Sequence, residues 1–276
     1  MSAAAFRSEH QRAFGSLHVA IKRRGPASVL ADLRQDGCLK ARFPRPVDWA
    51  DVVTLNSSGG VAGGDRLECV FEVREGARAT FASQAAERFY RALPGEPPSH
   101  VRTRLTVADG GAAEWLPQEG ILFDRAALDR VLEVDLAEDA WFLGVESLVF
   151  GRTAMGERVA AAHLADTIRV RRGGRLLLHD AIRLSGAVAA TLGGLATARG
   201  GATVATLIHV APDAETRLDD LRAAWETAPA EVGASAWNGM LVGRVVARDG
   251  ACLRAAVVAG LRTLRAERPL PRVWLC

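Results

Sequence analysis

The stretch NSSGGVAGGDRLECVFEVREGARATFASQAAERFY, from Asn56 to Tyr90, carries most of the fold prediction. It opens with glycines at four of six successive positions, namely Gly59, Gly60, Gly63 and Gly64. Glycine adopts positive φ and allows close backbone approach, so this density indicates a path that side chains would obstruct. Asp65 follows the glycines, where its carboxylate can cap the turn. We therefore expect this segment to let strands pass closely at the centre of the fold.

Downstream of the glycines, apolar and polar residues alternate. From Leu67 to Val73 the odd positions are apolar, which is the period of two that is typical of a strand. Glu75 and Gly76 then predict a turn into a partner strand around residues 79–82. Similar segments recur at intervals of about ten residues, which predicts a mainly β architecture. The other expected strands are residues 17–21, 28–33, 49–55, 101–107, 113–116, 131–136, 141–150, 168–170, 176–184, 202–210 and 240–247.

Helical periodicity is found only near the C-terminus. Thr216 and Asp219 resemble a capping box and begin an apolar pattern at spacings of three and four, which predicts a helix over residues 216–227. A second predicted helix has apolar residues at helical spacing from Leu253 to Leu264. Before it we expect a hairpin of residues 240–247 and 251–254. No linker divides the chain, so we predict one strand-rich domain over residues 1–276, with about two α-helices and mobile residues 1–12.

The composition is typical of an ordinary globular protein. The 276 residues are 49% hydrophobic and 24% charged, with a net charge of +3. The basic residues form no concentrated stripe, which argues against nucleic-acid binding. No apolar run reaches the roughly 18 residues of a membrane helix, and charges interrupt the N-terminal region where a signal peptide would be apolar. We expect a cytoplasmic protein without a membrane or nucleic-acid partner.

The motifs of catalysis and tight ligand binding are incomplete. The glycine segment lacks the Gly-Lys-Ser or Gly-Lys-Thr end of a phosphate-binding loop. The six histidines lack the i, i+4 spacing of a helical metal site, and the four cysteines form no C-x-x-C pair. A closed metal site is therefore not expected. Transient binding of a divalent ion by carboxylates, water and backbone carbonyls remains open.

The C-terminal tail RPLPRVWLC has the chemistry of an interaction segment. Tryptophan and arginine are enriched at interface anchors, so Arg272 and Trp274 are candidates for partner contact. Tails are mobile unless they are docked. Trp274 therefore packs either on its own domain or on a partner.

Five segments together resemble one family, the urease accessory protein UreD, also called UreH. They occur in the family's order over nearly the whole chain, which makes the combined match specific. This sequence departs from the family pattern at Ser57, Gly120 and Phe89. The matching segments are NSSGGVAGGDRL at Asn56 to Leu67, SQAAERFYR at Ser83 to Arg91, EWLPQEGILFDRA at Glu114 to Ala126, GRTAMGE at Gly151 to Glu157 and LPRVW at Leu270 to Trp274.

The resemblance implies a scaffold that is not an enzyme. Such a scaffold joins UreF and the GTPase UreG to the urease apoprotein and helps to deliver nickel. Ni²⁺ would be held only transiently, and GTP would be bound by UreG and not by this chain. The family fold is described as helically wound β-strands with two helices, enclosing a water-filled tunnel for nickel. The family-motif residues expected to be structural are Gly59, Gly60, Gly63, Gly64, Gln84, Tyr90 and Arg152.

Carboxylates in the matching motifs are candidates for the lining or mouth of that tunnel, by analogy with the family: Asp65, Glu119, Asp124 and Glu157. Each also has a structural interpretation, because paired carboxylates are common. Asp65 can cap the glycine turn, and Glu157 can pair with Arg152 or Arg158.

Two other functions stay open at this point. One is a hydrolase on a β-rich fold that uses Ser83 or Asp65 with His179. The other is a dedicated nickel-storage protein, which predicts tight stoichiometric binding by the isolated chain.

Overall fold

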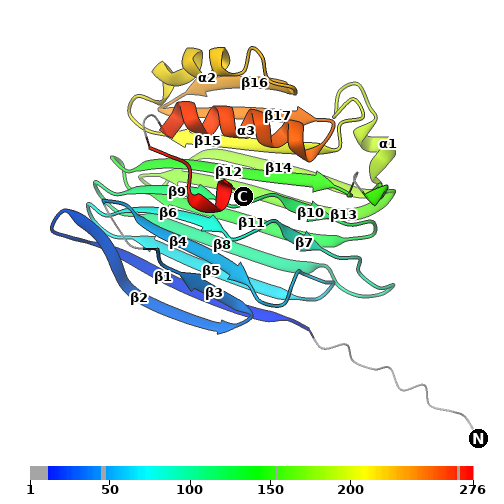
Figure 1. Ribbon diagram of the computed structural model, residues 1–276, viewed down its shortest axis with the longest axis horizontal. Coiled ribbons are helices and arrows are strands. Elements are labelled where there is room, and N and C mark those ends of the chain that lie inside the picture. Colours follow the sequence, from blue (N-terminus) through cyan, green and yellow to red (C-terminus); the bar gives the residue numbers. More distant parts are fainter. Residues whose placement is uncertain (1–11, 45–47, 153–154, 266–267, 276) are drawn as a thin grey trace, which may run out of the picture.

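Two β-sheets packed face to face make up most of the protein (Figure 1). The computed structural model describes residues 12–44, 48–152, 155–265 and 268–275. In these residues a seven-stranded sheet has the order β14-β13-β11-β8-β5-β1-β2. Its strands are β1 Phe14–Arg24, β2 Ala27–Gly37, β5 Arg66–Val73, β8 Ser99–Val107, β11 Ala127–Leu136, β13 Ala161–Arg172 and β14 Arg175–Ala187.

The opposing sheet is ten-stranded and has the order β16-β17-β15-β12-β9-β6-β4-β3, with β10 joined to β12 and β7 joined to β10. Its strands are β3 Leu39–Arg42, β4 Ala50–Asn56, β6 Arg78–Ser83, β7 Glu87–Phe89, β9 Ala112–Leu116, β10 Gly120–Leu122, β12 Trp141–Phe150, β15 Thr203–Val210, β16 Glu231–Trp237 and β17 Met240–Ala247.

The chain winds between the two sheets as a helix of strands. It passes from β5 to β6, β8, β9, β11, β12 and β13, alternating between the sheets, and neighbouring strands of this series within each sheet are parallel. The turns from β5 to β6, from β8 to β9 and from β11 to β12 are short, and Gly76 and Gly110 both adopt φ +62° there. A side chain is disfavoured at such angles, which explains the glycines that the sequence has at these turns.

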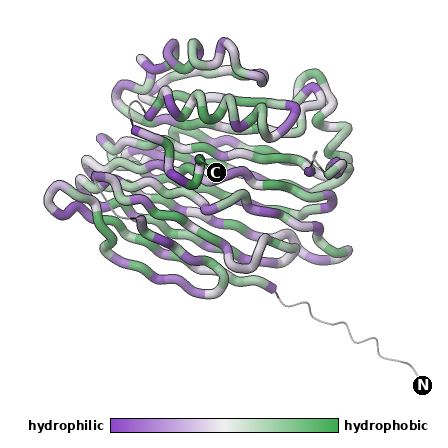
Figure 2. Tube along the Cα trace, viewed as in Figure 1, coloured by the Kyte–Doolittle hydropathy of each residue, from purple (hydrophilic) through white to green (hydrophobic). Residues whose placement is uncertain are grey.

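The alternation of apolar residues fixes which face of each strand is buried. Phe71, Leu105, Val134 and Val170 are partners in register on four neighbouring strands, and all four are buried between the sheets. Hydrophobic and hydrophilic positions alternate along the strands in Figure 2. Burying a side chain of this size contributes about 1.5–3 kcal/mol, so the stacked rows form the main core.

The helices are α1 Val188–Leu192, η2 Ala214–Arg217, α2 Leu218–Ala224, α3 Gly250–Arg265 and η3 Arg272–Trp274. Helices α2 and α3 cover the ten-stranded sheet at its β15, β16 and β17 end, whereas α1 contacts β13 and β14 of the seven-stranded sheet (Figure 1). Trp225 packs between α3 and β17, where it donates a hydrogen bond from Nε1 to Ala256 O at 2.8 Å. A Cβ on Gly243 would lie 2.5 Å from the Trp225 ring. Glycine at this position is therefore what lets the indole approach the sheet.

The strand-rich fold with helices near the C-terminus is confirmed, but two local predictions were wrong and one helix was missed. Residues 251–254 begin α3 instead of closing a hairpin, because Asp249 Oδ1 accepts a hydrogen bond from Cys252 N at 2.8 Å and caps the helix. Thr216 does not cap α2, since its hydroxyl donates to Asp213 O within a 3₁₀ turn. The short helix α1 was not predicted. The predicted mobility of residues 1–12 falls almost wholly outside the described residues.

Candidate functional site: the hollow between the sheets

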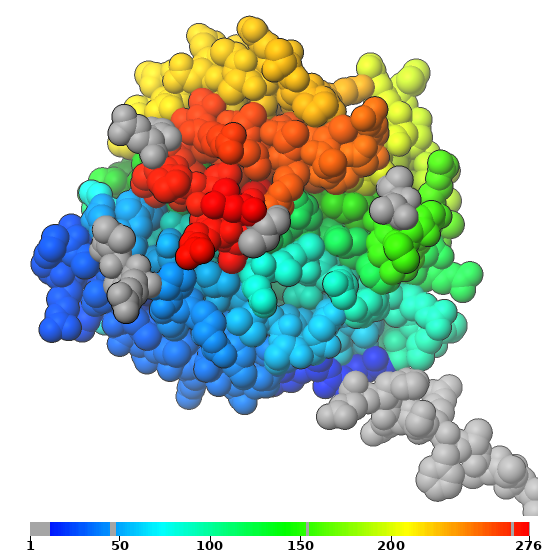
Figure 3. Space-filling model, viewed as in Figure 1, coloured from blue at the N-terminus to red at the C-terminus, as the bar shows by residue number. Residues whose placement is uncertain are grey.

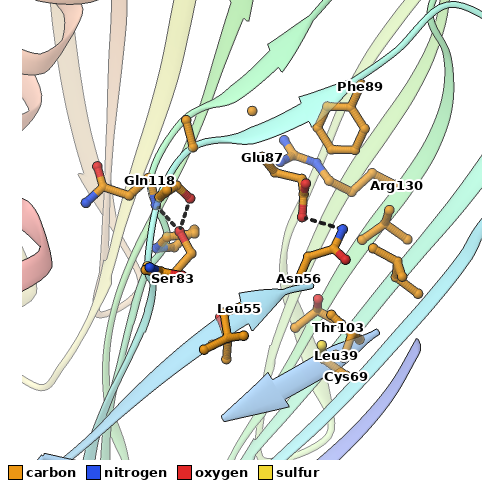
Figure 4. Close-up of a pocket in the computed structure, with 18 of the residues that line it drawn as sticks. Leu39, Leu55, Asn56, Cys69, Ser83, Glu87, Phe89, Thr103, Gln118 and Arg130 are labelled. Atoms are coloured by element: carbon orange, nitrogen blue, oxygen red, sulfur yellow. Dashed lines mark hydrogen bonds between the residues drawn. The ribbon is translucent and has the colours of Figure 1, made fainter. Parts of the chain in front are cut away.

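A cavity of about 280 Å³ lies between the two sheets and has room for several water molecules (Figure 4). Gln84 and Ala85 are exposed at its rim, and Arg130 and Glu146 lie at its buried end. We call this space the inter-sheet hollow. Its other principal wall residues are Asn56, Gly59, Cys69, Ser83, Glu87, Phe89, Thr103, Trp115 and Gln118.

The glycine segment shapes one wall of the hollow. Gly60 adopts φ +145°, and a Cβ there would lie 2.4 Å from the Tyr90 ring and 2.9 Å from Arg88 O. The Tyr90 hydroxyl donates to Gly59 O at 2.9 Å, which holds the glycine turn against the end of β7. The predicted close passage of backbone is thus present, and it brings Asn56 beside Glu87.

Glu87 is a carboxylate without a strong countercharge. Its Oε2 accepts a hydrogen bond from Asn56 Nδ2 at 3.2 Å (Figure 4). None of the ion pairs found among the described residues includes Glu87. Burial raises the pKa of this carboxyl above its ordinary value, and the Asn56 hydrogen bond opposes the shift. Burial also raises the pKa of the neighbouring Cys69 to about 12, so the thiol stays neutral.

Three buried charges close the inner end of the hollow. Arg130 donates from Nε and Nη2 to the two oxygens of Asp166 at 2.9 and 2.7 Å, and its Nη1 lies 2.7 Å from Glu146 Oε2. Trp115 Nε1 donates to the other oxygen of Glu146 at 2.7 Å. Burial raises the pKa of Glu146, and the attraction of Arg130 opposes that effect. We call Arg130, Glu146 and Asp166 the charged triad.

A second, much smaller hollow of about 10 Å³ lies on the far side of the triad, with room for about one water. Arg130 and Glu146 line both hollows, and Asp166 also lines the small one. Beyond it, Arg244 pairs with Asp180 at 2.7 Å, and Arg244 is partly exposed. The two hollows therefore adjoin at the triad, which separates them.

The four carboxylates predicted for nickel transit do not line the inter-sheet hollow. Asp65 is buried and accepts hydrogen bonds from Ala13 N and Ala62 N, each at 2.8 Å, so it fastens the glycine turn. Glu119 lies 3.3 Å from Arg254 Nη1. Asp65 thus caps the glycine turn, as its structural interpretation stated, and Glu119 is paired with an arginine.

Asp124 and Glu157 lie together at another corner. Asp124 Oδ1 accepts from the backbone N of Ala160 and of Ala161, at 2.8 and 3.0 Å. Glu157 pairs with Arg152 at 2.6 Å, and its other oxygen lies 3.4 Å from Asp124 N. A role of any of the four in transit stays a prediction.

The family-motif residues have structural contacts. Gly64 needs glycine because its φ is +81°. Gly63 needs glycine for space, because a Cβ there would lie 2.8 Å from the Ala92 side chain. The Arg152 guanidinium stacks over the Phe123 ring, and Tyr90 meets the same ring edge-on.

The C-terminal tail is docked on its own domain. Trp274 is buried and donates from Nε1 to Leu116 O at 3.0 Å, and Gln118 Nε2 donates to Val273 O at 2.6 Å. Figure 3 shows the red tail lying on the surface beside α3. The sequence left open whether Trp274 packs on its own domain or on a partner, and in the structure it packs on its own domain. Arg272 is exposed.

The residues considered for hydrolysis are not assembled into a catalytic site. Ser83 Oγ donates a hydrogen bond to Ala85 O and accepts one from Gln118 N, so the hydroxyl proton is already committed to a backbone carbonyl. His179 lies exposed on β14 of the other sheet. Over the described part of the chain, no three His, Cys, Asp or Glu side chains are grouped as metal ligands.

Sequence reasoning missed Glu87 and the charged triad. Arg130, Glu146 and Asp166 each occupy an inward position on an otherwise apolar strand face. A charged residue in the apolar phase of an alternating strand was the available signal, since buried charges are rarely tolerated without partners.

Comparison with known proteins agrees with the resemblance in the sequence. The family described as UreD urease accessory protein matches residues 13–275. A protein of Azorhizobium caulinodans named urease accessory protein UreD is 44% identical over 266 residues, covering 96% of this chain and 97% of its own. The chain belongs to the UreD family. Proteins of the same name from Sinorhizobium medicae (44% over 268 residues, 96% of each chain) and Rhizobium leguminosarum (42% over 275 residues, 99% of each chain) are similar along their full lengths.

Four of the five segments that carry the resemblance to UreD lie at the inter-sheet hollow. Residues 56–67, 83–91 and 114–126 each contribute several of its wall residues. The segment 270–274 docks beside Gln118 at the wall. Most of the UreD motifs, which are scattered along the chain, thus lie in one region of the molecule, and the described residues of the segment 151–157 lie outside it.

Proposed function

We propose that this chain is an accessory scaffold for urease maturation that joins UreF and UreG to the urease apoprotein and helps to pass nickel to it. Membership of a family of urease accessory proteins supports the role in maturation. The inter-sheet hollow, lined by the Glu87 carboxylate that none of the ion pairs among the described residues includes, is the single observation that carries the proposal of nickel transit.

Transit needs weak successive contacts, because an ion that is bound tightly does not leave. Ni²⁺ accepts oxygen and nitrogen donors, and the residues that line the hollow include Glu87 with its carboxylate and Thr103 with its hydroxyl. The family resemblance directed attention to Asp65, Glu119, Asp124 and Glu157. We propose Glu87 as the first residue to test, because it faces the hollow.

The proposed scaffold has no catalytic role and no tightly bound cofactor. Nickel is its cargo, and GTP belongs to UreG. The separation of Ser83 from His179 in the fold supports the choice of a scaffold over a hydrolase. Among the described residues, none of the helices has the length and hydrophobicity that a membrane span requires. The cytoplasm is the proposed location.

Co-expression tests this function. The chain is produced with UreF, UreG and the urease subunits, and the nickel content of purified urease is compared with that from cells that lack only this chain. We expect a complex of this chain with UreF and UreG, and nickel-poor urease when the chain is omitted. Full nickel loading without the chain would contradict the proposal.

A further inference from the structure

The charged triad is a barrier as well as a link between the two sheets. Arg130 lies on β11 and Asp166 on β13 of the seven-stranded sheet, whereas Glu146 lies on β12 of the opposing sheet. All three side chains are at most 12% exposed. The guanidinium thus lies where the large hollow meets the small one, bonded to a carboxylate from each sheet.

A guanidinium fixed at this point opposes the passage of cations. A positive group that lines a narrow route repels an approaching cation, and this repulsion is strong where water is scarce. Arginine also stays charged at every physiological pH, so loss of a proton cannot open the route. A cation crosses only if the guanidinium moves.

The two carboxylates offer a replacement for that contact. Arg130 supplies one positive charge to two buried carboxylates, which leaves the triad with a net charge of −1 if all three groups are ionised. A divalent cation in the same place would neutralise them fully. Trp115 holds Glu146 independently of Arg130, so one oxygen ligand keeps its orientation when the guanidinium leaves. The large hollow on the near side gives the displaced side chain room to move.

We infer that Arg130 is the gate between the two hollows: its guanidinium closes the passage from one to the other in the free chain, and a divalent cation passes by taking its place between Glu146 and Asp166. This inference rests on the proposed transit of nickel, and it adds the group that controls it. The resting chain then has no ready nickel site at the triad, because arginine occupies it.

Titration calorimetry of the purified full-length chain with Ni²⁺ alone tests the gate. Arg130→Gln removes the competing charge, and we expect one additional Ni²⁺ per chain, bound about tenfold or more tightly than by the wild type. Ni²⁺ should raise the Tm of this variant more than that of the wild type. The double variant Arg130→Gln/Glu146→Gln should lose both effects. Arg102→Gln, which removes a guanidinium on the outer face of β8, is the matched control.

Arg130→Lys keeps a positive charge between the carboxylates but not the two-pronged contact, so it covers the case in which Arg130→Gln fails to fold. We expect it to bind Ni²⁺ more tightly than the wild type. Equal Ni²⁺ affinity in the wild type and in the folded Arg130 variants would overturn the gate. The proposed nickel transit is tested by a different measurement, the nickel content of urease matured with Glu87→Gln. A negative result there would leave the calorimetric test of the gate unchanged.

Discussion

At the scale of single residues, Glu87 combines burial with the absence of a strong countercharge. A carboxyl whose folded pKa is raised stabilises the protein below its unfolded pKa, and this contribution is lost as the pH rises through the folded pKa. At pH 8 the ionised group therefore lowers stability. A glutamine at this position keeps an oxygen for the hydrogen bond from Asn56.

Glu87→Gln is accordingly expected to raise the free energy of unfolding at pH 8 by about 1 kcal/mol. Urea denaturation at pH 8 and at pH 5 measures it, and the gain should shrink at pH 5. Glu68→Gln, on the exposed face of β5, is the control and should have little effect. Destabilisation by Glu87→Gln at pH 8 would show that the carboxylate is held by contacts that favour its charge.

His209 predicts a second pH dependence. Burial lowers the pKa of its imidazole below the ordinary 6.5, and the hydrogen bond to Phe142 O at 3.1 Å opposes this. The folded state favours neutral histidine, so stability is complete above the unfolded pKa and falls as the pH drops through it. We expect the free energy of unfolding to decrease from pH 7 to pH 5, and less steeply in His209→Gln. The exposed His163 provides the control, His163→Gln, and an identical slope in both variants would refute the assignment.

Residue roles were predicted from the sequence less well than the fold. Asp65 was expected to cap the glycine turn, and its two backbone hydrogen bonds agree. The triad could not be predicted, because pairing between Arg130 and Glu146 depends on how two sheets stack, which no local pattern specifies. Glu87 lies within a recognised motif, yet its environment depends on Asn56, more than 30 residues away along the chain.

At the scale of elements, the glycine turn gives a matched pair of substitutions. Gly59 and Gly60 both have positive φ, but a Cβ on Gly59 meets nothing within 4 Å, whereas a Cβ on Gly60 collides with Tyr90 and Arg88 O. Backbone strain costs about 1–3 kcal/mol at either site. Gly60→Ala should therefore destabilise the protein by about 1 kcal/mol or more beyond Gly59→Ala, since it adds overpacking. Thermal unfolding compares them, and equal losses would contradict the close passage of strands.

Helix α3 is fastened to β9 by a buried ion pair. Arg265 donates from Nε and Nη2 to the two oxygens of Glu114 at 2.8 and 2.9 Å, and Glu114 is fully buried. Arg265→Met removes two charge-assisted hydrogen bonds but leaves Arg268 paired with this carboxylate at 2.6 Å, and should cost about 1.5–3 kcal/mol. Arg262→Met on the exposed side of the same helix should cost less than about 0.5 kcal/mol. Chemical denaturation measures both, and similar losses would exclude a fastening role for Arg265.

Most strands could be predicted because alternation is a local signal, and the span from Leu67 to Val73 is the clearest case. The start of α3 could not be predicted reliably. Asp249 and Gly250 are typical both of a hairpin turn and of a helix start, and the choice depends on packing of α3 against β15 and β17.

At the scale of the whole molecule, helical winding of strands gives two flat walls with side chains between them. Where the inward residues are large and apolar, as at Phe71 and Phe81, the walls are closed by packing. Where they are small or polar, as at Thr103, space remains and the inter-sheet hollow forms. The inter-sheet hollow is therefore a consequence of which inward positions are not filled by large side chains.

The most direct test of the account is the nickel content of urease matured with Glu87→Gln, with Glu68→Gln as the control. Both variants should form the complex with UreF and UreG, because each change is isosteric and neither alters the docked tail. We expect nickel per urease active site to fall severalfold with Glu87→Gln and to stay at the wild-type value with Glu68→Gln. Wild-type nickel content with Glu87→Gln, in an intact complex, would contradict transit through the inter-sheet hollow.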